Sequence, residues 1–431
     1  MITTATLQRS NVRWLICALL FFATTINYID RAVFAILGPM LGDVFKWSEV
    51  EYSRMIMAFQ LTYAIGYATT GRLLDVIGVR KGFLLIVGAW SAAAVAHGLV
   101  SFVPHGTVLS LSLPVLAFGV ARAALGLAEG GNFPASIKTV AEWFPKEQRA
   151  LATGWFNAGS NAGAIACPLL VPVLVKHWGW PGAFYATGAV GFVWLGAWWW
   201  LYRAPEEHPR VSASELAHIR KDPPDVVAQK TPWLELLACR PTWAFITGMA
   251  ASAPVWWFYI FWGPKFLKAQ FNLDLTGSSV PLAMIFLGAG FGGIGGGWLS
   301  SALLRRGWNL NASRKLALLV CALGAVPVFA TPLVGNVWLA VVLIGVAAAA
   351  HCGYAANLFT LVSDTMPRQA VGSVVGIGGM AGAVAAIFFA ELTGRVLQSG
   401  NGYQLLFTIA SASYLVALGV MHLLVPRLEQ S

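Results

Sequence analysis

The segment GRLLDVIGVRK, residues 71–81, lies between two long apolar runs near 55–74 and 82–103. Each run has about the 20 predominantly apolar residues that a bilayer-spanning helix needs. The glycines of the segment allow a tight turn and close contact between helices, and Asp75 can pair with basic groups at a neighbouring helix end. The segment therefore predicts a charged loop between two membrane spans, with Asp75 and Arg80 as candidate gating residues.

Further apolar runs bring the number of predicted spans to twelve. Strands of a membrane β-barrel would be short and alternating in hydrophobicity, whereas these runs are long and do not alternate. The first run continues past Pro39, too far for a signal peptide, so we expect it to remain in the mature protein. The sequence predicts an all-α membrane protein with helices near 14–39, 55–74, 82–103, 110–133, 150–175, 182–202, 243–263, 280–303, 316–334, 337–362, 371–394 and 405–425.

The composition agrees with this fold class, because 58% of the residues are hydrophobic and only 11% are charged. Soluble domains average about 25% charged residues, so this chain has too few charges to cover a soluble surface. The formal net charge of +10 could suggest a nucleic-acid partner, but such proteins cluster Lys and Arg on one face. Here the basic residues are spread thinly between apolar runs, which favours a lipid bilayer and excludes nucleic acid.

The distribution of basic residues predicts the orientation. Of the 28 Lys and Arg, 20 lie on the side that holds both termini and six on the opposite side, while Arg31 and Arg122 lie inside spans. Lys and Arg accumulate in cytoplasmic loops. We therefore expect a multi-pass membrane protein with both termini in the cytoplasm.

The longest polar stretch, Arg203 to Arg240, follows the sixth span and carries four prolines among mixed charges. It predicts a cytoplasmic linker with one short amphipathic helix, too short for a catalytic domain. The predicted organisation is an N-terminal six-helix half (1–203), a linker (204–240) and a C-terminal six-helix half (241–431). Transporters built from such repeats bind substrate at the midplane between the halves.

The sequence favours a transporter over an enzyme. A membrane-embedded enzyme would need a nucleophile, a metal cluster or an acid pair that a polar substrate can reach, and only Asp30 with Glu129 resembles such a pair. Chemically altered substrate after incubation would favour the enzyme. The five cysteines have no metal-ligand spacing, and we expect no metal and no cofactor.

Four ionisable residues lie inside spans: Asp30 and Arg31 in the first, Arg122 and Glu129 in the fourth. Charges in a bilayer are costly and mark functional sites. Arg122 and Glu129 are two turns apart, about 10 Å along one helix face, and Asp30 could reach between them. A purely structural ion pair is a stronger alternative for Asp30, which stands beside Arg31 and could be its counter-ion, whereas burial is expected to favour protonation of Glu129, as proton coupling requires.

Tyr28 and Arg31 share one face of the first span with Asn27, so a hydroxyl and a guanidinium can reach the same ligand. The planar guanidinium suits a carboxylate because it donates two parallel hydrogen bonds. The predicted substrate is a small anion. The alternative is that these charges are buried ion pairs that only fix helix packing.

Other polar residues in the spans are candidates for binding substrate hydroxyls: Tyr63 in the second span, Ser160 and Asn161 in the fifth, and Asn357 in the tenth. Hydrogen bonding between helices is the alternative for each. His351 is predicted to be a packing residue. Glycines and alanines spaced four apart predict helix-packing faces in the eighth and eleventh spans. In the eighth span these residues are Gly288, Gly292 and Gly296, with Ala289, Gly293 and Gly297 one residue on, and in the eleventh span they are Gly372, Gly376, Gly378, Gly379 and Gly382.

Several of these segments resemble the major facilitator superfamily. The loop at 71–81 is similar to its loop signature, with Val76 in place of a basic residue, and Ser301 stands where the second half would carry the equivalent acid. Other runs resemble the anion:cation symporter family, and the region from Ala356 to Gly376 its hexuronate group. The matching runs are Asn27–Arg31, Arg122 with Glu129–Pro134, Glu142–Pro145 and Phe156–Asn161.

This resemblance implies the major facilitator fold and a proton-coupled symporter of a bacterial inner membrane, which imports a hexuronate, such as galacturonate or glucuronate, by alternating access. Arg31 would hold the substrate carboxylate. Asp30 and Glu129 would carry protons, and Arg122 would modulate Glu129. Contacts to substrate hydroxyls would come from Tyr28, Tyr63, Ser160, Asn161 and Asn357.

Two other transport functions stay open at this point. One is import of a different organic anion, such as an aldonate, tartrate or an aromatic acid, because Cys352, Gly353 and Tyr354 depart from the residues usual after His351. The other is export by drug:proton antiport. In each case we expect a monomer whose partners are protons, the small-molecule substrate and the lipid bilayer.

Overall fold

The computed structural model describes residues 10–108, 111–222, 233–366 and 368–427. The chain divides into two compact units: unit 1 comprises Met1–Val33, Thr62–Cys167 and Val173–Val226, and unit 2 comprises Phe34–Leu61, Pro168–Pro172 and Val227–Ser431. The predicted halves, 1–203 and 241–431, differ from these units in residues 34–61 and 168–172, which pack with unit 2.

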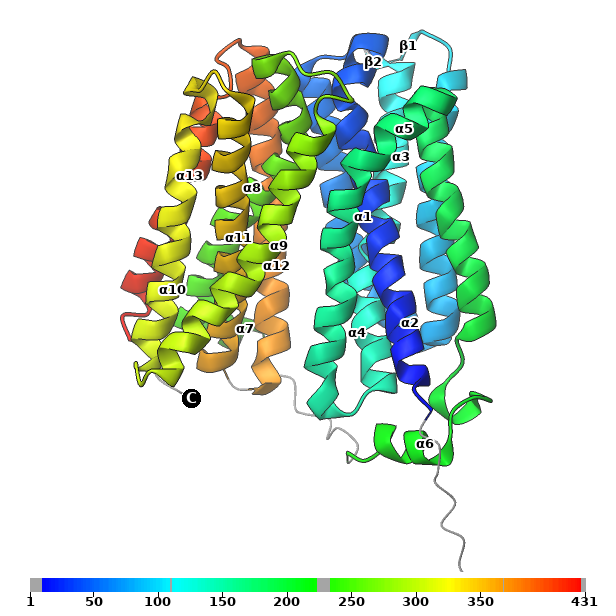
Figure 1. The fold of residues 1–431 in the computed structure, drawn as a ribbon, viewed down its shortest axis with the longest axis vertical. Helices are drawn as coiled ribbons and strands as arrows, with labels where there is room; N and C mark the ends of the chain where they lie inside the picture. The colour runs from blue at the N-terminus through cyan, green and yellow to red at the C-terminus, as the bar shows by residue number, and fades with distance from the viewer. Residues whose placement is uncertain (1–9, 109–110, 223–232, 367, 428–431) are drawn as a thin grey trace, which may run out of the picture. The chain divides into compact units, whose positions relative to one another are not determined.

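Ten helices in the described part of the chain are long and apolar enough to span a membrane (Figure 1). Two of them, α2 (Glu49–Leu99) and α5 (Lys146–Leu201), are interrupted by non-helical backbone at Gly78 (φ 78°) and Gly179 (φ 69°). Glycine adopts these conformations without the steric cost that a side chain imposes. Each of the two helices therefore contains two spans, so the ten helices provide the twelve predicted spans.

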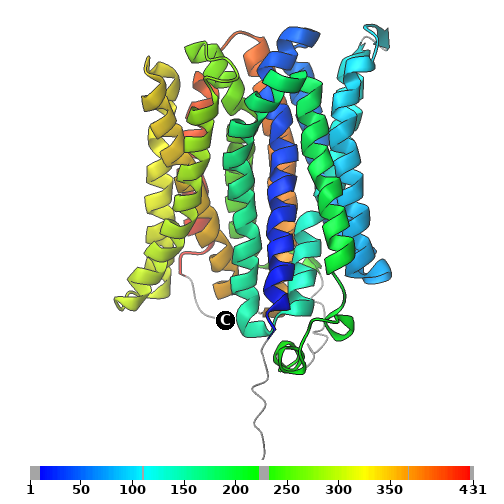
Figure 2. The same ribbon diagram turned by 45° about the vertical axis from the view of Figure 1, so that its right-hand side comes forward.

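The first helix, α1 (Val12–Phe45), runs without interruption through both units (Figures 1 and 2). The predicted fourth span corresponds to α3 (Leu113–Glu129), which a two-stranded hairpin precedes and α4 (Asn132–Trp143) follows. The hairpin pairs β1 (Thr107–Val108) with β2 (Leu111–Ser112). Gly130 and Gly131 keep right-handed helical angles, so the helical path extends beyond the apolar run that the sequence defines.

Unit 2 contains the helices of the predicted C-terminal half. Their lengths agree with the predicted spans, except that the ninth span begins as an α-helix and ends as a 3-10 helix at Val326–Leu333. These helices are α8 (Arg240–Phe271), α9 (Ser279–Arg305), α10 (Leu310–Ala325), α11 (Val337–Thr365), α12 (Arg368–Gln398) and α13 (Gln404–Leu424). Unit 2 also contains α7 (Trp233–Ala238), a second short helix of the predicted linker.

The predicted glycine face of the eighth span is confirmed. A Cβ atom on Gly292 would lie 2.1 Å from the Ala349 carbonyl oxygen, and one on Gly296 would lie 2.3 Å from the Gly353 Cα. These distances are far below van der Waals contact, so only glycine permits α9 and α11 to pack this closely.

The prediction for the eleventh span is confirmed for two of its five glycines. Gly378 and Gly382 contact α8, at Phe245 and Met249. A Cβ atom on Gly372, Gly376 or Gly379 would meet nothing within 4 Å. The glycines of this helix lie on more than one face, and only one of these faces packs against a neighbouring helix.

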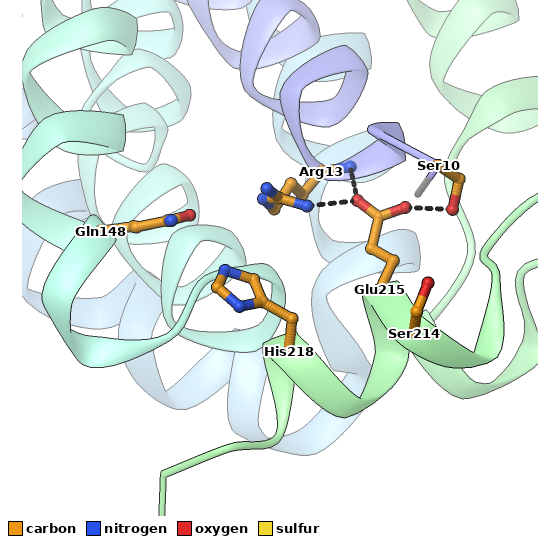
Figure 3. A pocket seen from close by; sticks show the side chains of 6 residues that line it. All are labelled: Ser10, Arg13, Gln148, Ser214, Glu215 and His218. Atoms are coloured by element: carbon orange, nitrogen blue, oxygen red, sulfur yellow. Dashed lines mark hydrogen bonds and ion pairs between the residues drawn. The ribbon is translucent and has the colours of Figure 1, made fainter. Parts of the chain in front are cut away.

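The first part of the predicted linker belongs to unit 1 and contains the expected short helix, α6 (Ala213–Ile219). In both views α6 lies beside the N-terminal end of α1 (Figures 1 and 2). The buried Glu215 carboxylate accepts hydrogen bonds from Ser10 Oγ (2.5 Å), from the backbone N–H of Val12 and Arg13 (3.2 Å each) and from Arg13 Nη1 (2.9 Å) (Figure 3). Glu215 therefore caps α1 by satisfying N–H groups that a helix terminus leaves unpaired. Predicted linker residues 223–232 lie outside the described residues.

Candidate functional site

The Arg31 guanidinium is held in a buried site of unit 1. Its Nε donates to Glu129 Oε2 at 3.0 Å and its Nη2 donates to Asn27 Oδ1 at 3.0 Å. The guanidinium carbon lies 4.7 Å from the centroid of the Tyr28 ring and 4.8 Å from that of Tyr63. Two hydrogen bonds and two cation–π contacts therefore fix its position.

Two close backbone contacts bring Glu129 and Tyr63 to this arginine. A Cβ atom on Gly66 would lie 2.0 Å from the Leu127 carbonyl oxygen, and one on Gly130 would lie 2.4 Å from the Tyr63 carbonyl oxygen. The two glycines therefore allow α2 and the C-terminal end of α3 to touch. This contact places the ring of Tyr63 and the carboxylate of Glu129 on the same guanidinium.

The alternative in which Asp30 serves as the counter-ion of Arg31 is not what the structure shows, because the ion pair of Arg31 is with Glu129. Consecutive helical residues point about 100° apart, so Asp30 and Arg31 diverge. Asp30 is 2% exposed and lies near Cys167 and Thr187 of α5. No cation forms an ion pair with it within the described residues, and it does not bridge Arg122 and Glu129.

Arg122 is fully buried on α3 and interacts electrostatically with Glu129 and with His97 of α2. His97 bonds through Nδ1 to the Ala93 carbonyl oxygen at 2.7 Å and stacks on Phe184 at 5.2 Å. Sequence reasoning missed His97. An ionisable side chain inside the third span was the available signal.

Ser160 and Asn161 lie on the part of α5 that packs against α1. A Cβ atom on Gly163 would lie 2.9 Å from the Tyr28 Cβ, so the two helices meet at the site. Ser160 Oγ donates to the Asn157 carbonyl oxygen at 2.7 Å, whereas Asn161 is half-buried. The structure thus groups five of the six predicted substrate contacts on unit 1: Tyr28, Arg31, Tyr63, Ser160 and Asn161.

Asn357, the sixth, belongs to α11 of unit 2. Its side-chain amide donates to the carbonyl oxygens of Gly296 and Gly353, both at 2.9 Å. The bond to Gly296 ties α11 to α9, and the bond to Gly353 lies within α11, so only Oδ1 is available to accept a further hydrogen bond. His351 is in a packing position as predicted, since it bonds to Tyr414 at 2.9 Å and stacks on Trp256 at 4.9 Å.

The predicted gating residues pair with neighbouring helices of unit 1. Asp75 accepts a hydrogen bond from Lys138 of α4 at 2.6 Å. Arg80 donates to the Trp199 carbonyl oxygen at 2.8 Å and its guanidinium carbon lies 4.8 Å from the Trp199 ring. In unit 2, Arg314 bonds to Asp364 (2.8 Å) and Ser300 (2.9 Å), a pairing that the sequence at Ser301 did not predict.

Comparison with known proteins identifies the family. The model of the Major Facilitator Superfamily matches residues 20–390. The chain belongs to the Major Facilitator Superfamily. Its twelve spans thus form the predicted fold, and this major facilitator protein is a transporter rather than an enzyme.

Two curated relatives of this transporter cover nearly its whole length. It is 31% identical to the hexuronate transporter of Escherichia coli K12, over 92% of this chain and 90% of the relative. It is 28% identical to the probable galactarate/D-glucarate transporter GarP of the same organism, over 95% and 93%. A solved D-xylose-proton symporter shares the fold, with a TM-score of 0.73, 15% identity and coverage of 95% and 97%.

Proposed function

We propose that this transporter imports a hexuronate, such as galacturonate or glucuronate, together with protons. The observation that supports the proposal most directly is the buried Arg31 guanidinium, held by Glu129 and lying between the rings of Tyr28 and Tyr63. A sugar acid carries a carboxylate for the guanidinium and hydroxyls for neighbouring polar side chains. The names of the hexuronate and galactarate/D-glucarate transporters support the same substrate class.

Coupling to protons follows from competition for Arg31. A substrate carboxylate must share or replace the hydrogen bond that Glu129 accepts at 3.0 Å. Protonation of Glu129 removes its negative charge and makes the guanidinium available to the anion. The four buried side chains Asp30, Arg31, Arg122 and Glu129 together carry a formal charge of zero. Binding one proton and one monoanionic substrate keeps this total at zero, which limits the free-energy cost of burying the loaded site in the membrane.

The remaining roles are assigned by position. Asp30 is the second proton carrier, buried near α5 without a cationic partner among the described residues. Arg122 modulates Glu129 through its positive charge. Hydroxyls of the substrate contact Tyr28, Tyr63, Ser160 and Asn161, and Asn357 accepts a hydrogen bond through Oδ1.

Uptake into proteoliposomes tests the proposal. Radiolabelled galacturonate is expected to accumulate when the outside is more acidic than the inside, and a protonophore should abolish that accumulation. Unchanged uptake with the protonophore would contradict proton coupling. Fluorescent tags at the two termini, quenched from the cytoplasmic side only, test the proposed inner-membrane orientation.

A second candidate substrate is a different sugar acid or organic anion, which the similarity to a probable galactarate/D-glucarate transporter favours. Thermal unfolding with a panel of hexuronates, aldonates, aldarates and aromatic acids separates these candidates, because only a ligand that binds the folded state raises the Tm. Stabilisation by glucarate but not by galacturonate would replace the hexuronate assignment.

A further inference from the structure

The C-terminal end of α1 and the N-terminal end of α2 pack against helices of the predicted C-terminal half. Residues 34–61 belong to unit 2, where they contact α8 and α12. A Cβ atom on Gly394 of α12 would lie 2.7 Å from the Ser53 Cβ, and the Glu49 backbone N–H donates to Gln398 Oε1 at 3.1 Å. We name this contact between residues 34–61 and helices α8 and α12 the seam.

An aromatic side chain fills the seam. Tyr52 is fully buried, and its ring stacks on Phe34 at 5.7 Å and meets the edge of Trp262 at 5.7 Å. Its hydroxyl donates to the Phe261 carbonyl oxygen at 2.8 Å. Gly38 makes room for the ring, since a Cβ there would lie 3.1 Å from it. Tyr52 thus joins α2 to α1 and α8 at once.

Two ion pairs lie beside this tyrosine. Lys265 Nζ bonds to Glu49 Oε2 at 2.5 Å and lies 4.5 Å from the centroid of the Tyr52 ring. Lys268, one turn further along α8, bonds to Asp43. The Lys265 side chain is 11% exposed, against 37% for Lys268, so the Lys265 pair is less screened by water and is the stronger of the two.

We propose that Glu49, Tyr52 and Lys265 form a latch that holds the outward route of the transporter closed. The acid and the tyrosine come from α2 of the predicted N-terminal half, and the lysine comes from α8 of the predicted C-terminal half. Opening on the predicted outer side separates these halves, which breaks the ion pair, the cation–π contact and the tyrosine hydrogen bond together. The latch rests on the transport function but not on which anion is carried.

Chemical labelling measures latch opening without any substrate. Ser53 is fully buried in the seam, so the thiol of a Ser53→Cys variant is expected to react slowly with a membrane-impermeant maleimide added outside. Adding Lys265→Gln or Glu49→Gln should raise the labelling rate about tenfold, as expected for the loss of one charged hydrogen bond in a two-state equilibrium. The parent protein, with its five native cysteines, gives the background.

A matched control is Glu391→Gln, which breaks the Glu391–Arg395 ion pair within α12 at 2.8 Å and leaves Glu49, Tyr52 and Lys265 unchanged. It should leave the labelling rate of Ser53→Cys unchanged. Equal labelling with and without Lys265→Gln and Glu49→Gln would overturn the latch. So would an equally large increase from the control.

A disulfide across the seam tests whether opening is needed for transport. The two Cβ positions at residues 53 and 394 are 2.7 Å apart, which is about 1 Å shorter than the mean Cβ–Cβ distance of a disulfide, ~3.8 Å. A Ser53→Cys/Gly394→Cys variant should lose galacturonate uptake on oxidation and recover it with reductant, whereas each single variant should not respond. Uptake that persists after cross-linking would refute the latch. Absence of galacturonate uptake in the unmodified protein would instead refute the proposed substrate and leave the labelling result valid.

Discussion

Replacement of Glu129 by Gln separates substrate binding from proton coupling. Gln keeps the shape of the side chain and an oxygen that can accept from Arg31 Nε, but it cannot bind a proton. The 3.0 Å bond therefore changes from an ion pair to a neutral acceptor. Hydrogen bonds to charged groups contribute about 1.5–3 kcal/mol and neutral ones about 0.5–1.5 kcal/mol. The bond from Arg31 to Gln is therefore weaker than the bond to Glu129 by roughly 1–1.5 kcal/mol, and the substrate carboxylate displaces it more easily.

That difference corresponds to about tenfold tighter binding of the sugar acid at a pH where Glu129 is ionised. Binding to the variant should also lose the part of its pH dependence that Glu129 causes. Accumulation should fall, because each coupled proton contributes about 1.36 kcal/mol, or tenfold, per pH unit of gradient. The variant should therefore concentrate at least about tenfold less substrate than the unmodified transporter across one pH unit, while exchange of labelled for unlabelled substrate continues.

Proteoliposomes measure both quantities, by concentration-dependent exchange and by the accumulation ratio at a fixed pH gradient. Glu147→Gln is the control, since this carboxylate is 56% exposed and pairs with Lys221 outside the site. If Glu129→Gln concentrates substrate to the same ratio as the unmodified protein, Glu129 is not a coupling acid and the competition model fails.

Three further predictions concern the same structure. Arg31→Lys keeps the positive charge but loses the planar guanidinium that donates two parallel hydrogen bonds, so substrate binding should weaken about 10–100-fold. The KM for exchange measures this, and an unchanged KM would show that Arg31 does not bind the substrate. Gly296→Ala forces a Cβ to within 2.3 Å of the Gly353 Cα and should cost about 1–3 kcal/mol, seen as a lower Tm, whereas Gly297→Ala meets nothing within 4 Å and should be neutral. Glu215→Ala removes the cap of α1 and should cost about 1–3 kcal/mol, with Ser214→Ala as the control; equal Tm values for the two would contradict the capping role.

The spans could be predicted from the sequence because a bilayer demands long apolar runs, and a run's length and polarity are local properties. The paired glycines of the eighth span could be predicted for a similar reason, since their spacing places them on one helix face. The partner of Arg31 could not. It depends on the rotation of α1 and α3 and on the close approach that Gly66 and Gly130 allow, whereas in the sequence the acid adjacent to Arg31 is Asp30.

The polar residues show the same limit. Asn357 was recognisable as a polar residue inside a span, but only the structure shows that its amide donates to Gly296 and Gly353 and so serves helix packing. His97 attracted no notice because a lone histidine has no motif around it. Its significance comes from Arg122, which the fold brings near.

The unbroken course of α1 has a mechanical consequence. Arg31 and Phe34 are three residues apart on this 34-residue helix, so the guanidinium proposed to bind the substrate and the ring that stacks on Tyr52 are separated by less than one turn. No loop lies between them to absorb movement. If a sugar acid at Arg31 tilts α1, the tilt therefore moves the stacking partner of Tyr52 as well, and the proposed binding site and the proposed latch are coupled through a single helix.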